Sequence, residues 1–248
     1  NPFTGSAGVG REQWTNNIVP SQYLSPITQS AMTKFFPAVN SAKDLNSNLL
    51  LDDYTQLRNE YQTRDNLDLK INWQRTPTNM IWGKLGYMKN TGSGNNFYLG
   101  FDNPSVGDTR VILTTFGTTW TLGPSTVLDG NFGMSRQDQT VLPADYGTNY
   151  GLQLGIPGTN NSNDIRESGL PVMASTYTLN SGSASWMPLW RKEISYSGTL
   201  ALTKVLAKHE MRTGFDFVRL ELNHNQAEWG DYGLKGGFSF SGNTTGAV

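Results

Sequence analysis

The chain has 248 residues, enough for one large all-β domain or two small ones, and only 16% of them are charged while 36% are hydrophobic. The formal net charge of −1 offers no basic surface for nucleic acid, and the absence of cysteine excludes disulfides, thiolate metal sites and a thiol nucleophile. No apolar run approaches the ~18 residues of a membrane-spanning helix, although membrane β-strands carry a much weaker signal.

Residues 1–51 have the composition of a loop of extracellular type that contains one short helix. Ser25 and Pro26 match an N-cap and a first helical position, and Pro37 ends the segment. The apolar residues at helical spacing between them are Ile27, Ala31, Met32 and Phe35. We therefore expect a surface helix over about residues 26–36, followed by a partial β-barrel over residues 52–248.

The clearest alternation in the chain lies between Asp65 and Gln74. Its apolar residues are Leu67, Leu69, Ile71 and Trp73, and its polar residues are Asn66, Asp68, Lys70, Asn72 and Gln74. Successive side chains of a strand point to opposite faces, so one face is wholly apolar and the other wholly polar. Two surroundings need such a strand: a soluble sheet with one face on a core, or a barrel with lipid outside and water inside.

The same unit of strand, tight turn, strand and long loop then repeats. We expect seven strands, at residues 64–74, 80–89, 110–122, 127–137, 193–205, 209–222 and 234–241, with long loops at 90–109 and 139–192. In the strand 209–222 the alternation slips, because Leu220 and Leu222 share a face with Arg212. This slip indicates a bulge near Val218 or the end of the membrane-embedded zone.

The lengths of the connections favour a membrane barrel. Short turns fall at one end of the hairpins and long loops at the other, as in outer-membrane barrels, and a soluble sandwich would rarely need a loop of roughly 50 residues. Aromatic residues that could form interfacial girdles lie near the strand ends; they are Trp73, Trp82, Tyr87, Trp120, Trp190 and Tyr196. The expected fold is all-β: an antiparallel up-and-down meander of long hairpins, part of a transmembrane β-barrel, with a short helix near the N-terminus.

No group of residues indicates catalysis, a cofactor or a metal site, and we expect the chain not to be an enzyme. His209 and His224 are isolated in the sequence. The segment Asn160–Asp164 could supply oxygen ligands to calcium, but it lacks the pattern of an EF-hand loop, which favours a solvated loop. The glycines at 92, 94, 236 and 237 match no phosphate-binding signature and are better interpreted as turn and strand glycines. The charged residues of the polar faces, which we expect to form a hydrated wall with paired charges, are Asp68, Lys70, Lys84, Asp129, Arg212 and Asp216.

Several short stretches, in their order along the chain, resemble the β-barrel of TonB-dependent outer-membrane receptors of the Oar-like, carboxypeptidase-regulatory-like branch. These stretches are Asn17–Pro20, Leu24–Ile27 and Lys34–Pro37; Tyr61–Asp65 and Trp82–Tyr87; Leu154–Gly158 and Gly169–Pro171; His209–Phe217; and Gly237–Gly242. The resemblance implies a barrel of about 22 strands with a plug domain and a TonB box. Neither is recognisable here, and about seven strands are too few, so we expect an internal fragment of such a barrel.

The resemblance also implies a function without chemistry of its own: ligand capture and energy-coupled passage across the outer membrane of a Gram-negative cell. The expected partners are outer-membrane lipid, a plug domain and TonB through other parts of the parent protein, and an unknown extracellular ligand bound at the long loops. The alternative is a soluble secreted or surface all-β module that binds carbohydrate or acts as an adhesin. In a barrel the apolar strand faces stay bare of protein, whereas in a sandwich they meet a second sheet about 10 Å away.

Overall fold

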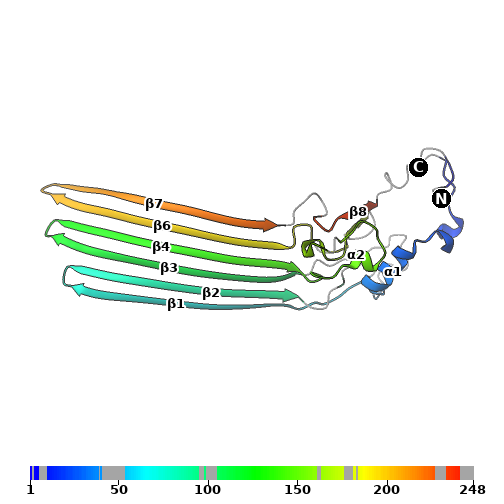
Figure 1. Cartoon of the computed structure of the whole chain (residues 1–248), viewed down its shortest axis with the longest axis horizontal. Coiled ribbons are helices and arrows are strands. Elements are labelled where there is room, and N and C mark those ends of the chain that lie inside the picture. The colour runs from blue at the N-terminus through cyan, green and yellow to red at the C-terminus, as the bar shows by residue number, and fades with distance from the viewer. Residues whose placement is uncertain are drawn as a thin grey trace.

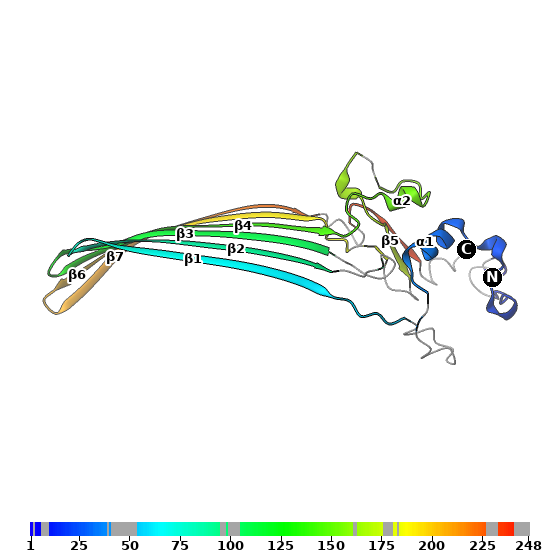
Figure 2. The ribbon, with the colours of Figure 1, turned by 90° about the horizontal axis from the view of Figure 1, so that it is seen from below.

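A computed structural model describes residues 1, 3–5, 10–38, 40, 54–94, 98, 105–160, 163–175, 181–182, 184–226 and 233–240. The described chain has two parts: a long, curved, twisted sheet, and a loop assembly gathered at one end of it (Figures 1 and 2). The tight turns of the sheet lie at the opposite end.

The sheet consists of six long strands in the order of the chain. They are β1 (Glu60–Thr76), β2 (Asn79–Gly94), β3 (Ser105–Gly123), β4 (Thr126–Pro143), β6 (Leu189–Leu206) and β7 (His209–Gln226). Every neighbouring pair is antiparallel, which confirms the meander of long hairpins. Within the described residues β1 and β7 each pair with one neighbour only, so the sheet is open at both edges.

At the loop end each long strand runs beyond its expected boundary. The loops therefore shrink from the expected 90–109 and 139–192 to residues 95–104 and 144–188. The added residues at the end of β2, Asn90–Gly94, are polar or glycine on both faces. The alternation of apolar and polar residues stops where the apolar surroundings stop, but the hydrogen-bonded ladder continues, so the sequence pattern underestimates strand length.

Successive hairpins are staggered along the strand direction (Figure 1). Asn79, at the tip of the first hairpin, lies opposite Trp120, three residues before the end of β3 at Gly123. Thr126, at the tip of the second, lies opposite Lys204, two residues before the end of β6 at Leu206. With a rise of ~3.3 Å per residue and strands ~4.8 Å apart, this stagger corresponds to a strand tilt of about 35–45°, the tilt found in closed barrels.

The prediction of a seventh barrel strand at residues 234–241 is wrong. β8 (Gly237–Phe240) has four residues and pairs in parallel with β5 (Val172–Ser175), which lies inside the loop between β4 and β6. Both strands belong to the loop assembly (Figure 2). The alternation of Phe238 and Phe240 with smaller residues resembles that of a barrel strand, but it is too short to distinguish a loop strand from a membrane one.

The loop assembly contains the helices of the described residues, all of them short. They are α1 (Pro26–Phe35), α2 (Tyr150–Gln153) and the 3₁₀ turns at Thr15–Asn17, Ser21–Tyr23 and Ile165–Glu167. The Thr28 amide donates to Ser25 Oγ over 3.5 Å, which confirms Ser25 as the N-cap of α1. A small core joins α1 to the loop 144–188; its buried residues are Ala31, Phe35, Leu154, Ile156 and Leu170. None of the described helices is long and apolar enough to cross a membrane.

Candidate functional site

One face of the sheet, here called the outward face, carries the apolar residues of β1. The side chains of Leu67, Leu69, Ile71 and Trp73 are between 51% and 60% exposed, so no second sheet covers them in the described structure. The strand register places apolar residues of each of the other five long strands on the same face. They include Ile81, Leu85 and Tyr87; Ile112, Phe116 and Trp120; Leu128, Phe132 and Met134; Ile194, Leu200 and Leu202; and Met211, Phe215 and Phe217.

The height of this apolar band suits a lipid bilayer. On β3 the outward apolar residues run from Ile112 to Leu122, beyond which Arg110 is charged. Ten residue steps cover ~33 Å along a strand, and a tilt of about 40° reduces this to a height of about 25 Å. Outer-membrane barrels carry an outward apolar band of about 25 Å.

The change of pattern in β7 marks the edge of this band and is not a bulge. The pairing of β6 with β7 continues without a shift through Val218, so the bulge expected there is wrong. Instead, an ion pair of 2.6 Å between Arg219 and Glu221 occupies the outward face just past Phe217. Leu220 and Leu222 consequently lie on the inward face, beyond the apolar band of their own strand. The alternation therefore slips because the membrane-embedded zone ends there, which is the alternative to a bulge that the sequence pattern allows.

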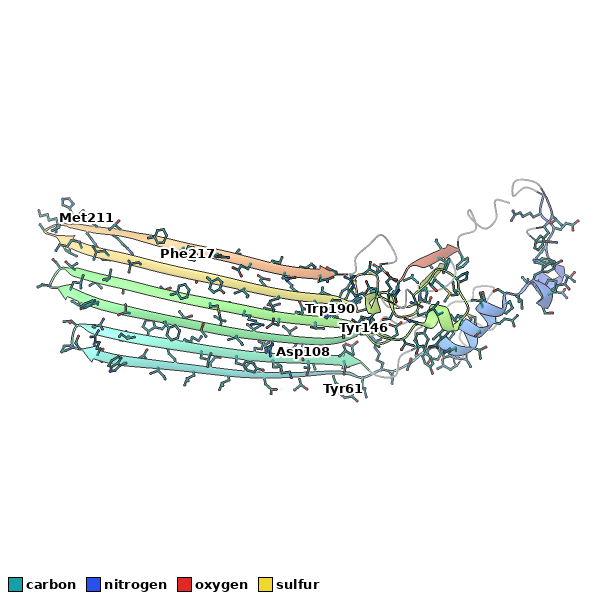
Figure 3. The ribbon with its side chains drawn as sticks, viewed as in Figure 1. Tyr61, Asp108, Tyr146, Trp190, Met211 and Phe217 are labelled. Carbon is teal, nitrogen blue, oxygen red and sulfur yellow. The ribbon has the colours of Figure 1, made fainter. Side chains whose placement is uncertain are left out.

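Four of the six expected girdle aromatics flank the band on the outward face. Trp73 and Trp120 lie toward the tight turns, and Tyr87 and Tyr196 lie toward the loops. Trp190 lies further toward the loops, with its ring centroid 6.1 Å from that of Tyr146 (Figure 3).

The prediction that Trp82 belongs to the interfacial girdle is wrong, because Trp82 lies on the inward face. Its indole lies directly over Gly117 of β3, in the space that a Cβ atom at position 117 would occupy. The sequence around Trp82 does not indicate that its ring packs over a glycine of the neighbouring strand, because that contact depends on the strand register.

The inward face brings together some of the charges expected there but not all. Lys84 Nζ lies 3.7 Å from Asp68, Lys70 Nζ lies 5.6 Å from the centre of the Trp82 ring, and Thr119 Oγ1 donates to Asp129 over 2.9 Å. No described ion pair involves Arg212 or Asp216. The arrangement is a polar wall whose charges are partly paired.

At the loop end, the inward face has a polar hollow of about 510 Å³ across β1 to β4. Its floor includes Gly92 and Gly107, which are directly paired across β2 and β3, together with Gly94. Polar side chains surround the floor; among them are Glu60, Gln62, Asn90, Thr109 and Gln139. Gly92 and Gly94 are strand glycines, in agreement with the sequence, and only the strand register shows that Gly107 lies beside them.

A buried asparagine holds the loop 144–188 together, although the segment Asn160–Asp164 was expected to be solvated. Asn160 is 3% exposed; its Oδ1 accepts from the Gly151 amide over 2.6 Å, and its Nδ2 donates to the carbonyls of Glu167 and Gly169 over 2.7 and 3.0 Å. Its positive φ of 52° is a conformation that asparagine tolerates better than most residues. Asn161 and Ser162 lie outside the described residues.

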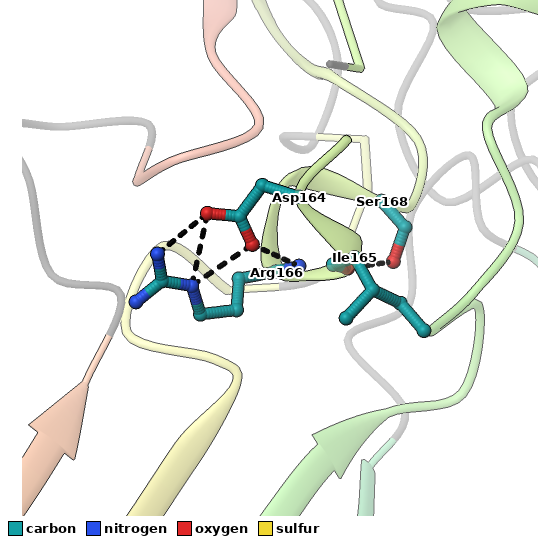
Figure 4. Close-up of polar contacts among 4 residues, drawn as sticks. All are labelled: Asp164, Ile165, Arg166 and Ser168. Carbon is teal, nitrogen blue, oxygen red and sulfur yellow. Dashed lines mark hydrogen bonds and ion pairs between the residues drawn. The ribbon is translucent and has the colours of Figure 1, made fainter. Parts of the chain in front are cut away.

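The carboxylate of Asp164 is engaged by its own loop (Figure 4). The guanidinium of Arg166 donates to both carboxylate oxygens over 2.5–3.0 Å, and the Arg166 amide donates to Oδ1 over 3.0 Å. Hydrogen bonds from the Arg166 side chain and backbone lower the pKa of Asp164 to about 2. The oxygen atoms considered for calcium at Asn160 and Asp164 are thus already used by the protein.

The loop assembly also contains two buried ionisable residues that no sequence pattern indicates, Asp145 and Lys235. Asp145 is 4% exposed and accepts from the Leu170 amide over 2.6 Å, and Lys235 is also 4% exposed. Burial lowers the pKa of the Lys235 ammonium from 10.5 to about 8, and the charge of Asp145 opposes part of that shift. Ninety residues separate the two in sequence, and no motif surrounds either of them.

The two histidines remain apart from any cluster of ligands. His224 Nε2 lies 2.7 Å from Gln226 Oε1, and His209 begins β7 at a tight turn. In the part of the chain that the structure describes, no three His, Cys, Asp or Glu residues are grouped so that they could hold a metal ion.

A two-faced antiparallel sheet with a bare apolar band, a polar inner wall and loops at one end defines a membrane β-barrel protein. The sequence matches the family model described as an outer membrane beta barrel domain over residues 1–248. The chain therefore belongs to this family, and its sheet is part of a barrel in the outer membrane. No curated protein and no solved structure matches the chain.

Proposed function

We propose that the chain is a section of the barrel of a TonB-dependent outer-membrane receptor of the Oar-like branch. The observation that carries this proposal is the bare apolar band opposite a polar wall, which ends in a polar hollow at the loop end of the sheet. Within such a receptor the chain takes part in ligand capture and in energy-coupled passage, and it performs no chemical step.

The open edges of the sheet support a larger barrel. β1 and β7 each present an unpaired side to the membrane in the described structure, and unpaired backbone groups in lipid cost several kcal/mol each. Further strands must therefore pair with both edges. A barrel of about 22 strands, as the resemblance implies, would supply them.

The position of the hollow supports ligand capture at the loop end. We place the loops at residues 95–104 and 144–188 outside the cell and the tight turns in the periplasm, as in other outer-membrane barrels. The hollow then opens at the outer mouth of the barrel, where an arriving ligand first meets the wall.

The bare apolar face argues against the soluble carbohydrate-binding or adhesin alternative. A sandwich would cover residues such as Ile71 and Phe215, but these are 60% and 67% exposed. A water-soluble module with such an uncovered band would aggregate.

The orientation can be tested directly because the chain contains no cysteine. Leu152→Cys places a thiol on the loop assembly, and Lys208→Cys places one at the β6–β7 turn; both positions are exposed. In intact cells that make the full-length protein, a membrane-impermeant maleimide should label Cys at 152 and reach position 208 only after permeabilisation. The opposite pattern would show that the loops face the periplasm.

Energy coupling needs a separate test. The full-length protein, purified in detergent, should retain the periplasmic domain of TonB in a pull-down, and a large excess of untagged TonB domain should compete. A correctly assembled protein that does not retain the TonB domain would exclude TonB-dependent transport while leaving the barrel itself intact.

A further inference from the structure

The glycine-floored hollow of the inward face has features that indicate the chemistry of a ligand. Gly92 faces Gly107 across adjacent strands, and Gly94 follows on β2. A Cβ atom at 94 or 107 would meet nothing within 4 Å. Glycine weakens a strand, and one reason to keep it there is the close approach of a ligand to the backbone.

The rim of the hollow consists mainly of neutral hydrogen-bonding groups. Gln62 Nε2 donates to Asn90 Oδ1 over 3.1 Å on one side, and Thr109 and Gln139 line the other. Primary amides present a donor and an acceptor side by side, which matches the vicinal hydroxyls of a sugar, since each hydroxyl both donates and accepts.

The charge of the hollow is balanced. Its charged side chains, Arg58 and Glu60, form an ion pair of 2.9 Å. An anionic or cationic ligand would thus find no uncompensated partner. Val141 and Tyr61 are the only members of the lining with an aliphatic or aromatic side chain, so the hollow offers few apolar side chains to hold those of a peptide.

We propose that this hollow is a subsite for a neutral oligosaccharide. The sugar lies against the Gly92 and Gly107 backbone, and the amides of Gln62, Asn90 and Gln139 bind its hydroxyls. This inference rests on the proposed function, because it requires the inward face to be the lumen of a receptor, and it names the ligand class that the receptor captures at its mouth.

The experiment is calorimetric titration of the full-length protein in detergent with neutral hexasaccharides of glucose (α- and β-linked), xylose and mannose. Two probes of other classes are titrated in parallel: a ferric catecholate complex and a neutral hexapeptide. Gly107→Leu fills the hollow without a backbone clash. Gly123→Leu is its matched control, because it lies on the same strand, equally unobstructed, at the far end.

At least one hexasaccharide should bind, and Gly107→Leu should abolish its binding while Gly123→Leu retains it. Gln62→Ala and Gln139→Ala should each weaken binding by about tenfold, which is the effect of one lost hydrogen bond. If Gly107→Leu fails to assemble, these two variants decide whether the hollow binds the sugar. No binding by any hexasaccharide, equal binding by Gly107→Leu, or binding of the catecholate or peptide alone would overturn the proposal. Failure of sugar binding with TonB binding intact would remove this inference only; failure of TonB binding with sugar binding intact would remove the transport function only.

Discussion

At the scale of single residues, the loop assembly depends on one side-chain amide. Asn160 binds three backbone groups from two segments of the loop, so it replaces the ladder of hydrogen bonds that a strand would supply. The described part of the loop around Asn160 can keep a fixed shape with little regular secondary structure because these three backbone groups are satisfied in this way.

Replacing Asn160 by alanine should loosen the loop between β4 and β6. The change leaves the Gly151 amide and the carbonyls of Glu167 and Gly169 unpaired, and each buried unpaired group costs about 1–3 kcal/mol. Limited proteolysis of the full-length protein should show rapid cleavage within residues 144–188. Asn72→Ala, which removes the same amide from an exposed inward position of β1, should leave the digestion unchanged; equal rates in both variants would contradict this role for Asn160.

Lys235 should make the stability of the same assembly depend on pH. Its pKa falls from 10.5 to about 8 on folding, so between these values the unfolded form binds more protons and stability rises with pH. From pH 7 to pH 9.5 the gain is about 2 kcal/mol. The rate of proteolysis within 144–188, normalised to an unfolded substrate at each pH, should fall over this range, and Lys235→Met should remove the dependence. A flat profile in the unaltered protein would contradict it.

At the scale of elements, β2 and β3 fit together through a tryptophan and a glycine. The Trp82 indole occupies the place of a side chain at position 117, so the pair fills the inward surface as one unit. The outward face repeats this arrangement more loosely: ring atoms of Phe116 and Phe132 lie 3.4 Å from where Cβ atoms of Gly83 and Gly198 would stand. Aromatic rings over cross-strand glycines restore the packing that the glycines lack.

Gly117→Ala should therefore destabilise the barrel, because its methyl group displaces the indole of Trp82. Overpacking of this kind costs about 1–3 kcal/mol. Gly107→Ala is the matched control, since it lies on the same face of β3 with nothing within 4 Å of the new Cβ. The temperature at which the folded band disappears on a heat-modifiability gel should fall for Gly117→Ala only. An equal fall for both variants would show that the loss of stability comes from replacing a strand glycine and not from displacing the Trp82 ring.

The long strands and the helix α1 could be predicted from the sequence, whereas the rest of the loop assembly could not. Alternation such as that from Leu67 to Trp73 reports the two environments of a strand directly, so the hairpins and their faces follow from it. Beyond the apolar band both environments are water, and the ends of β2 and β4 were placed too early. The pairing of β5 with β8 and the contacts of Asn160 depend on distant segments that have no periodic pattern.

At the scale of the whole molecule, the position of each side chain relative to the membrane should decide whether the protein assembles. Arginine at Leu69, Ile71 or Leu200, one at a time, places a charge in the apolar band at a cost of about 2–4 kcal/mol. Asn72→Arg, between two of these positions but on the inward face, should be tolerated. Heat-modifiable mobility in an outer-membrane fraction measures assembly, and a protein that stays folded in water without detergent would refute the barrel.

The polar hollow can be recognised only in the assembled sheet and not in any single strand. Its lining comes from four strands, and Gly92 and Gly107 are brought together by a register that no local pattern specifies. The sequence showed which face is polar but not which polar residues share a neighbourhood, because cross-strand distances depend on pairing.

The stagger of the hairpins has a consequence for the bore of the parent barrel. Six strands ~4.8 Å apart and tilted by about 40° span an arc of ~38 Å, which would close on itself as a ring only ~12 Å across between backbones. Such a ring could not contain Trp82, Lys84 and Arg212 together. About 22 strands at the same tilt enclose a bore of ~44 Å, wide enough to admit a folded domain. In the proposed receptor, the six strands would form roughly a quarter of the barrel wall, and a bore of that width would leak unless another part of the protein obstructed it.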